Sequence, residues 1–292
     1  MKLKKQRTKS TPFSIVVFIA LTIYMVSVVT VLVWATMTSL RSHQAMKTSP
    51  LAIFSGLSFK NYTEVQEAMQ ITVSTSTDRL TYNLIGMIEN SLLYAGIGGF
   101  VQMFATVTVA YCTAKYKCLA SSIIRNIVIV TLIIPIVGST PSMIDFLTKL
   151  RFYDKFYGVM IMRISFTNSY YLVFYAAFSK LSWEYAESAF IDGASHVRVY
   201  FSIMLPLVKT LMATVFIIFF IYGWNDYQTP YMFLPSMPTA SLGLFHFFQN
   251  HNVDNIPKKM AGGVLVFLPV FIIFILFRNK IMGDLTEGGI KG

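Results

Sequence analysis

Residues 183–207, WEYAESAFIDGASHVRVYFSIMLPL, form a polar island between two long apolar segments. Ser182 precedes the island and can cap a helix that begins at Trp183, because a serine side chain accepts a hydrogen bond from a free amide of the first turn. Asp192-Gly193 then predicts a break, since glycine readily takes the left-handed conformation that ends a helix. Ser195 can cap a second helix. The island therefore predicts two short helices joined by a sharp bend.

Each helix of the island has a face suited to a neighbour. The second would lie across a membrane surface on an apolar stripe formed by Val197, Phe201 and Met204. The first has small side chains that permit a close approach to another protein, namely Ala186, Ser188 and Ala189. These features alone fit two interpretations: an ordinary amphipathic connector between membrane helices, or a docking element for a partner protein.

The composition indicates a membrane protein. Hydrophobic residues make up 55% of the 292 residues and charged residues only 13%, and the mean hydropathy is +0.60. A soluble domain carries about 25% charged residues. The formal net charge of +11 is compatible with a nucleic-acid partner, but in a membrane chain a basic excess more often marks cytoplasmic loops. We therefore expect an integral membrane protein without a nucleic-acid partner.

Six apolar runs alternate with polar loops, at residues 13–40, 91–112, 127–144, 157–178, 205–224 and 260–277. A helix of about 20 apolar residues crosses a bilayer. The first run follows a basic start but is too long for a signal peptide and lacks a clear small-residue cleavage site, so it predicts a retained helix. The predicted fold class is an all-α polytopic membrane protein with about six transmembrane helices.

Lysine and arginine predict the orientation of these helices. They are denser in residues 1–10, 114–126 and 278–292 than in the longer loops at 41–83 and 228–259, and basic residues concentrate on the cytoplasmic side of a membrane. Both termini and the island would therefore lie in the cytoplasm. The patch STSTD at 74–78 would be a solvated turn outside, or a contact with an external partner.

One arginine, Arg163, falls inside a predicted span. Such a charge costs roughly 2.5–3.5 kcal/mol at a helix centre on insertion scales, but Arg163 lies nearer the outer end, where its side chain can reach the interface. Thr167, Tyr170 and Phe174 continue its face at three- to four-residue spacing. This stripe fits helix packing, and it also fits the lining of a path for a sugar.

The residue order of the island adds a resemblance to a known family. Glu187-Ser188-Ala189-Phe190-Ile191-Asp192-Gly193-Ala194, followed by Ile203-Met204-Leu205-Pro206, resembles the EAA loop of bacterial ABC importer permeases, with the pattern E-A-A-x-x-D-G-A and then I-x-L-P. Ser188 replaces the middle alanine. A later proline common in that loop is absent, because Val208-Lys209-Thr210 stands there.

Further stretches extend the resemblance from Asn90 to the end of the chain. Glu89-Asn90-Ser91-Leu92 is similar to the N-S-L that opens the permease core, and Trp224-Asn225-Asp226 to the W-N-D/E that follows the fifth helix of sugar permeases. Residues 283–292, GDLTEGGIKG, resemble the G-G-L-T-x-G-x-x-K-G tail of the MalG-like subunit of carbohydrate importers. The resemblance implies three segments: residues 1–83 with the first helix and outer loop, a MetI-like permease core at 84–282, and a cytoplasmic tail at 283–292.

The resemblance implies a transport subunit in the bacterial cell (inner) membrane. Its partners would be a second homologous permease, giving a heterodimer, two ABC ATPase subunits that hold ATP and Mg, and a periplasmic or extracellular sugar-binding protein that contacts the loop at 228–259. This chain would bind no cofactor. The island would be the coupling-helix pair that docks on the ATPase, through Glu187, Ser188, Ala189, Asp192, Gly193, Ala194, Leu205 and Pro206. The tail would approach the ATPase dimer through Leu285, Thr286, Gly288, Lys291 and Gly292.

Other classes of function find less support. No G-x-x-x-x-G-K-[ST] pattern is present, so no P-loop for ATP is expected. Cys112 and Cys118 have no metal-ligand spacing. Two alternatives stay open: a permease for another solute such as a glycerol-phosphate compound, which strongly basic spans would favour, and a membrane-embedded enzyme, which needs a cluster of polar catalytic residues that Arg163 alone does not supply.

Overall fold

The computed structural model describes residues 11–50, 56–74, 79–134, 138–250 and 255–287. For residues 278–287 it describes the backbone alone. Two compact units are distinguished: residues 1–68 with 250–265, and residues 69–249 with 266–292. Helices make up most of the described chain, and one antiparallel hairpin pairs β1 (Ile71–Ser74) with β2 (Arg79–Tyr82). The predicted class, an all-α polytopic membrane protein, is confirmed.

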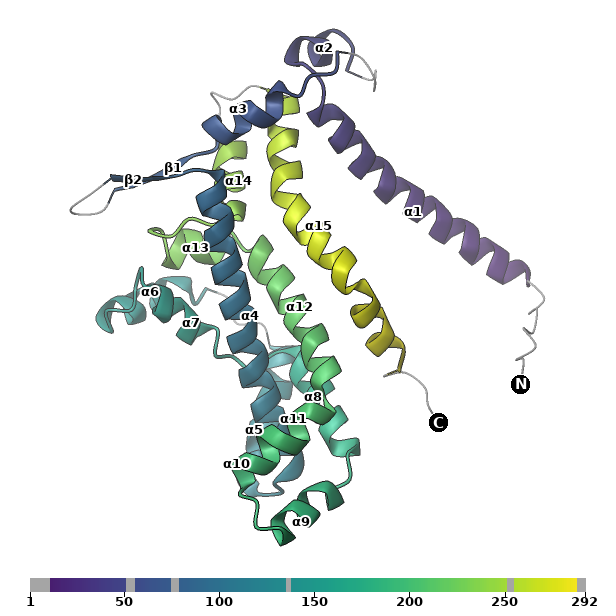
Figure 1. Cartoon of the computed structure of the whole chain (residues 1–292), viewed down its shortest axis with the longest axis vertical. Helices are drawn as coiled ribbons and strands as arrows, with labels where there is room; N and C mark the ends of the chain where they lie inside the picture. Colours follow the sequence, from purple (N-terminus) through teal and green to yellow (C-terminus); the bar gives the residue numbers. More distant parts are fainter. Residues whose placement is uncertain (1–10, 51–55, 75–78, 135–137, 251–254, 288–292) are drawn as a thin grey trace. The chain divides into compact units, whose positions relative to one another are not determined.

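The first unit begins with the long apolar helix α1 (Pro12–Ser39; purple in Figure 1). Thr11 caps it, because its hydroxyl accepts from the Ser14 amide at 3.3 Å. Pro12 suits the first turn, where no amide hydrogen is needed. The helix is long and apolar enough to cross a membrane, so the first predicted span is confirmed.

A buried arginine organises the segment that follows α1. The Arg41 guanidinium donates to the Ser49 carbonyl at 2.5 Å, just beyond α2 (His43–Thr48). A cation is favourable there because the helix dipole leaves partial negative charge on the last carbonyls. Asn61, on α3 (Lys60–Ala68), donates to the Arg41 carbonyl at 2.7 Å. This part of the predicted polar loop is therefore folded.

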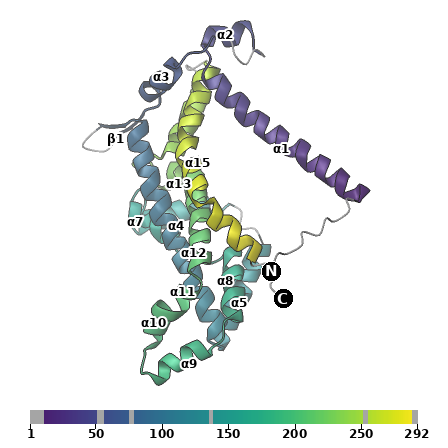
Figure 2. The same cartoon turned by 45° about the vertical axis from the view of Figure 1, so that its right-hand side comes forward.

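The second unit is built on α4 (Leu84–Lys115), and α12 (Lys209–Asn225) runs along it in both views (Figures 1 and 2). The two backbones meet at glycines. A Cβ on Gly99 would lie 3.1 Å from a backbone nitrogen of α12, and a Cβ on Gly223 would lie 3.1 Å from the Cα of Ala95. Small residues allow this close packing between membrane helices.

The predicted bounds of the third span, residues 127–144, are wrong. α5 (Leu119–Ile133) begins earlier and has 15 residues. α6 (Thr140–Lys149) is a separate helix with Pro141 in its first turn, where the missing amide hydrogen costs nothing. Pro141 therefore favours the start of α6 at this point.

The fourth predicted span, residues 157–178, is broken. It forms two helices, α7 (Phe156–Met162) and α8 (Ser169–Lys180). Residues 163–168 between them are not helical, and α4 supplies their polar partner: the Thr106 hydroxyl donates to the Ser165 carbonyl at 3.2 Å and accepts from Asn168 at 2.9 Å. Such contacts stabilise a break, because non-helical backbone at membrane depth needs hydrogen-bond partners from the protein.

Among the residues that the structure describes, three helices are long and apolar enough to cross a membrane, namely Pro12–Ser39, Leu84–Lys115 and Ile256–Phe277 within α15 (Ile256–Glu287). A pair bent by 79°, His196–Leu207 with Lys209–Asn225, is a fourth candidate. The predicted loop at 228–259 is partly helical, since it contains α13 (Gln228–Phe233) and α14 (Ala240–Gln249).

Candidate functional site

The first helix of the island, α9 (Glu184–Ile191), starts one residue later than predicted. Trp183 occupies the N-cap position and makes no side-chain capping bond, so the predicted cap by Ser182 is off by one position. The Ser182 hydroxyl, one residue before the N-cap, accepts from the Glu184 amide at 3.2 Å. Glu184 and Glu187 occupy the first turn, where their charges are favourable beside the positive end of the helix dipole.

Gly193 forms the predicted bend. Its φ is +80°, in the left-handed region that glycine reaches without steric cost. The Gly193 amide donates to the Phe190 carbonyl at 3.0 Å, and the Ala194 amide donates to the Ala189 carbonyl at 2.9 Å. This pair of bonds satisfies the last carbonyls of α9 and closes the helix as a Schellman motif.

The second helix begins as predicted and then widens. Ser195 caps α10 (His196–Val199) by accepting from the Arg198 amide at 3.3 Å. A π-helical turn, Tyr200–Met204, follows and leads into α11 (Leu205–Leu207). Turns of this kind are rare and often lie at functional sites.

The wider turn corrects the predicted apolar stripe. Met204 is fully buried, whereas Val197 and Phe201 are exposed. Val199 and Tyr200 are buried in their place. Val197 and Phe201 therefore share an exposed face, and of the three predicted residues Met204 alone departs from it. Met204 lies at the end of the π turn, which rotates side chains away from the positions that a regular helical spacing assigns them.

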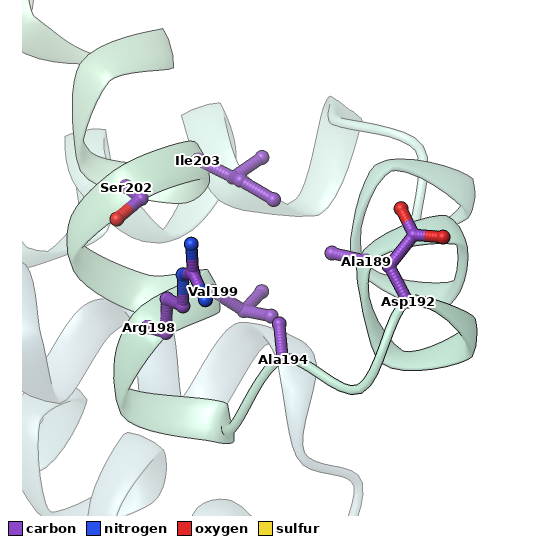
Figure 3. A pocket seen from close by; sticks show the side chains of 7 residues that line it. All are labelled: Ala189, Asp192, Ala194, Arg198, Val199, Ser202 and Ile203. Atoms are coloured by element: carbon purple, nitrogen blue, oxygen red, sulfur yellow. The ribbon is translucent and has the colours of Figure 1, made fainter.

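A groove of about 200 Å³ separates the two helices (Figure 3). The Ala189 and Ile203 side chains point into it from opposite sides. Its other lining residues are Asp192, Ala194, Arg198, Val199 and Ser202. Charged groups of both signs therefore line a groove whose centre is apolar.

Four side chains hold the bend against the end of α4, and we call them the aromatic clamp: Tyr116, Trp183, Phe190 and His196. The ring centroids are 6.0 Å apart for Tyr116 and Trp183, 6.0 Å for Trp183 and Phe190, and 4.6 Å for Phe190 and His196. Lys115 adds a bond from its amine to the Leu181 carbonyl at 2.6 Å. The sequence analysis missed the clamp, although Trp183, Phe190 and His196 lie within the island, because Tyr116 is brought to them only by the fold.

The predicted coupling residues differ in exposure. Glu187, Ser188, Asp192, Gly193 and Pro206 are exposed, Ala189 and Ala194 are half-buried, and Leu205 is buried. The two helices also expose large apolar side chains: Tyr185, Ile191, Val197 and Phe201. Ile191 is 86% exposed, and apolar side chains gathered on an exposed element are typical of a protein contact. The contact with an ATPase stays a prediction.

The predicted tail contact lies largely beyond the described part of the chain. The backbone of Leu285 and Thr286 continues α15. Gly288, Lys291 and Gly292 lie outside the described residues. An approach of the tail to the ATPase dimer therefore stays a prediction.

The candidate pore stripe does not lie on one helix. Arg163 and Thr167 belong to the break after α7, and only Tyr170 and Phe174 lie on α8. Phe174 is fully buried, Tyr170 packs edge-on against Phe219 at 5.1 Å, and Thr167 is exposed. The predicted helical spacing is thus corrected, and a pore role for these residues stays a prediction.

Arg163 has a partner that the sequence analysis did not identify. Its guanidinium lies 2.8 Å from the Asp226 carboxylate, and it also donates to the Tyr94 hydroxyl. Asp226 is the last residue of the W-N-D stretch, so that stretch carried the available signal. Among the described residues no group of three or more His, Cys, Asp or Glu side chains is placed to hold a metal ion.

Comparison with known proteins identifies the family. Residues 102–282 match the family described as "Binding-protein-dependent transport system inner membrane component". The chain is 28% identical over 195 residues to the probable starch degradation products transport system permease protein AmyC of Thermoanaerobacterium thermosulfurigenes, covering 65% of this chain and 70% of AmyC. It is 26% identical over 204 residues to the sn-glycerol-3-phosphate transport system permease protein UgpE of Yersinia pestis bv. Antiqua (strain Antiqua), covering 69% and 72%.

A solved structure has a similar fold. It is a chain of a bacterial ABC transporter involved in the import of the acidic polysaccharide alginate, with a TM-score of 0.70 and 18% identity, covering 93% of this chain and 99% of that one. The family match spans more than half of the chain and includes the whole island. Permeases of this family work with ATPase subunits and a solute-binding protein. This chain is a transport subunit and not an enzyme. The chain therefore belongs to the binding-protein-dependent inner membrane components, the permease subunits of ABC importers.

Proposed function

We propose that this permease subunit moves a sugar or oligosaccharide, sharing the path with a second homologous permease. Support comes from the named cargo of AmyC and of the alginate importer, and from the resemblance of residues 283–292 to the tail of carbohydrate permeases. The UgpE match favours a phosphate-bearing solute instead. Arg163 argues against that cargo, because its charge already pairs with Asp226 at 2.8 Å.

We call α9, the bend at Gly193 and α10 the elbow. The exposed elbow is the part of the chain that we propose to couple transport to the ATPase. The ATPase subunits would close on ATP and push the elbow, and the aromatic clamp would pass the push to α4. The exposure of Ile191 is the observation that carries this step. An isoleucine that is 86% exposed beside the bend fits an apolar cleft on a partner protein. The elbow and both termini would lie in the cytoplasm of the source bacterium.

Purification of the whole complex from its native membrane tests the partners. The tagged chain is isolated in mild detergent and its companions are identified. We expect two ATPase subunits and a second permease, with Ile191→Asp losing the ATPases while keeping the second permease. Leu57→Asp is the matched control, because Leu57 is also exposed, at 60%, and lies in the predicted outer segment. Equal ATPase recovery by both variants would remove the elbow from the docking site.

A second measurement identifies the cargo. The purified complex with its binding protein is supplied with ATP and, in turn, with maltose, longer maltodextrins, raffinose, and glycerol 3-phosphate. We expect one of the sugars to raise ATP hydrolysis. Stimulation by glycerol 3-phosphate alone would overturn the sugar assignment and leave the permease assignment intact.

A further inference from the structure

A charged cluster joins α4, the end of α7, the end of α12 and the first turn of α13 in the second unit. The Asp226 carboxylate accepts from the Arg163 guanidinium at 2.8 Å and from the Tyr94 hydroxyl at 2.8 Å, through the same oxygen. Its other oxygen accepts from the Thr229 amide at 3.0 Å. The guanidinium also stacks on the Tyr94 ring, 4.9 Å from its centroid. Each charge is therefore matched by an opposite charge or a hydrogen-bond partner.

The cluster is mostly shielded from solvent within this chain. The Arg163 and Asp226 side chains are 16% and 20% exposed, and Tyr94 is fully buried. Paired charges in membrane segments are uncommon and usually functional, because each charge is costly without its partner. The exposed ion pair between Lys149 and Asp145, with side chains 73% and 63% exposed, offers a contrast within the same chain.

The position of the pair gives it mechanical importance. Arg163 is the first residue after α7, where the broken span leaves its helix, and Asp226 is the first residue after α12. Two residues earlier, the buried Trp224 donates from Nε1 to the Val266 carbonyl of α15 at 3.2 Å. The pair thus joins the break at 163–168 to a point where α12 is held against α4 and α15.

We propose that Arg163 and Asp226 are positioning residues for transport: their ion pair fixes the break at 163–168 against the end of α12. The break contains Ser165, Thr167 and Asn168. Their side chains bond to one another, to the Thr106 hydroxyl and to the Tyr170 amide, and the ion pair adds a charged contact at the start of the break. A second restraint is present at the other end, because α13 begins two residues after Asp226. A displacement of α13 would therefore reach the break through the short ion pair between Asp226 and Arg163.

The test uses the whole complex in lipid vesicles and rests on the proposed sugar transport. Arg163→Gln and Asp226→Asn are made singly and together. Each single change leaves one charge unpaired, whereas the double variant leaves none, so the double variant should reach the membrane in normal amounts. We expect it to import sugar several-fold more slowly than the wild type and to hydrolyse ATP without loaded binding protein. A pair that serves folding alone predicts the opposite, with wild-type import and wild-type basal hydrolysis in the double variant, and that result would overturn the proposal.

A charge-reversed pair tests the role of the ion pair even if the neutral double variant fails to assemble. Arg163→Asp combined with Asp226→Arg restores an ion pair across the same contact. We expect it to import sugar faster than either of its single changes, and no gain over them would count against the proposal. Lys149→Gln with Asp145→Asn is the matched control and should leave import unchanged. Failure of the wild-type complex to import any sugar would refute the proposed function instead, while basal ATP hydrolysis would still report on the pair.

Discussion

The hydroxyl of Tyr116 lies 2.9 Å from Nδ1 of His196. This contact joins the residue that directly follows α4 to the first residue of α10. Trp183 and Phe190 pack beside it, so the bend meets the membrane helix through rings that have few rotatable bonds. A push on the elbow would therefore reach α4 directly through these rings.

Tyr116→Phe tests this link by removing the hydroxyl and keeping the ring. A hydrogen bond of this kind contributes about 0.5–1.5 kcal/mol, so we expect normal membrane insertion and a modest rise in ATP hydrolysed per sugar imported. The measurement is import and hydrolysis in the same vesicles. Tyr157→Phe is the control, since it removes a hydroxyl bonded to the Arg151 carbonyl at 3.3 Å, away from the clamp. Equal ratios for the two variants would mean that the Tyr116 hydroxyl takes no part in coupling.

Gly193→Ala isolates the effect of backbone conformation at the bend. A Cβ at Gly193 would meet nothing within 4 Å, and the same holds for Gly96, so neither change adds a clash. They differ in that only Gly193 has a positive φ, +80°, which costs a residue with a side chain roughly 1–2 kcal/mol. We expect Gly193→Ala to lower import while Gly96→Ala leaves it unchanged, as measured by sugar uptake per inserted permease. Loss of import in both variants, or in neither, would show that import does not depend on the left-handed conformation of Gly193.

The elbow shows what local sequence reasoning can reach. Gly193 and Ser195 act within a few residues of themselves, and the bend and the second cap follow from local chemistry that needs no knowledge of the rest of the fold. The stripe on the second helix was wrong at Met204, which is buried while Val197 and Phe201 are exposed, because the prediction assumed a regular helical period. The residue types at 200–204 do not predict a π turn. Within that turn Tyr200 contacts α4, because its hydroxyl lies 2.6 Å from the Thr108 hydroxyl, and such a contact between distant residues is not visible in the sequence.

Contacts between distant residues were beyond a single sequence for a related reason. Hydropathy identified an apolar run at 157–178 but could not show its break, because the polar groups of the break are satisfied by Thr106 on another helix. The sequence showed that Arg163 is an energetically costly charge in a predicted span, but it did not show which residue pairs with that charge. The W-N-D stretch was recognised by resemblance, yet only the fold brings Asp226 to 2.8 Å from Arg163.

Gly223→Val should weaken the contact between α4 and α12. A Cβ at Gly223 would lie 3.1 Å from the Cα of Ala95 and 3.3 Å from its Cβ, and the branched side chain adds further atoms there. Overpacking of this kind costs about 1–3 kcal/mol, so we expect a lower thermal midpoint and less permease in the membrane. Gly98→Ala is the control, because its Cβ would make only ordinary contacts at 3.7 Å. Equal thermal midpoints for the two variants would show that the helices separate easily at this point.

Cys118 offers a direct test of the predicted orientation. It is exposed in the connection between α4 and α5, and the charge distribution predicts that this connection is cytoplasmic. In a Cys112→Ser background, a membrane-impermeant maleimide should label Cys118 in inside-out vesicles and leave it unlabelled in intact cells stripped of their outer layers. The reverse result is expected for Leu57→Cys in a chain with both native cysteines replaced, since Leu57 is exposed in the predicted outer segment. Labelling of Cys118 from outside would invert the topology, put the elbow on the wrong side of the membrane for an ATPase, and so refute the coupling mechanism as a whole.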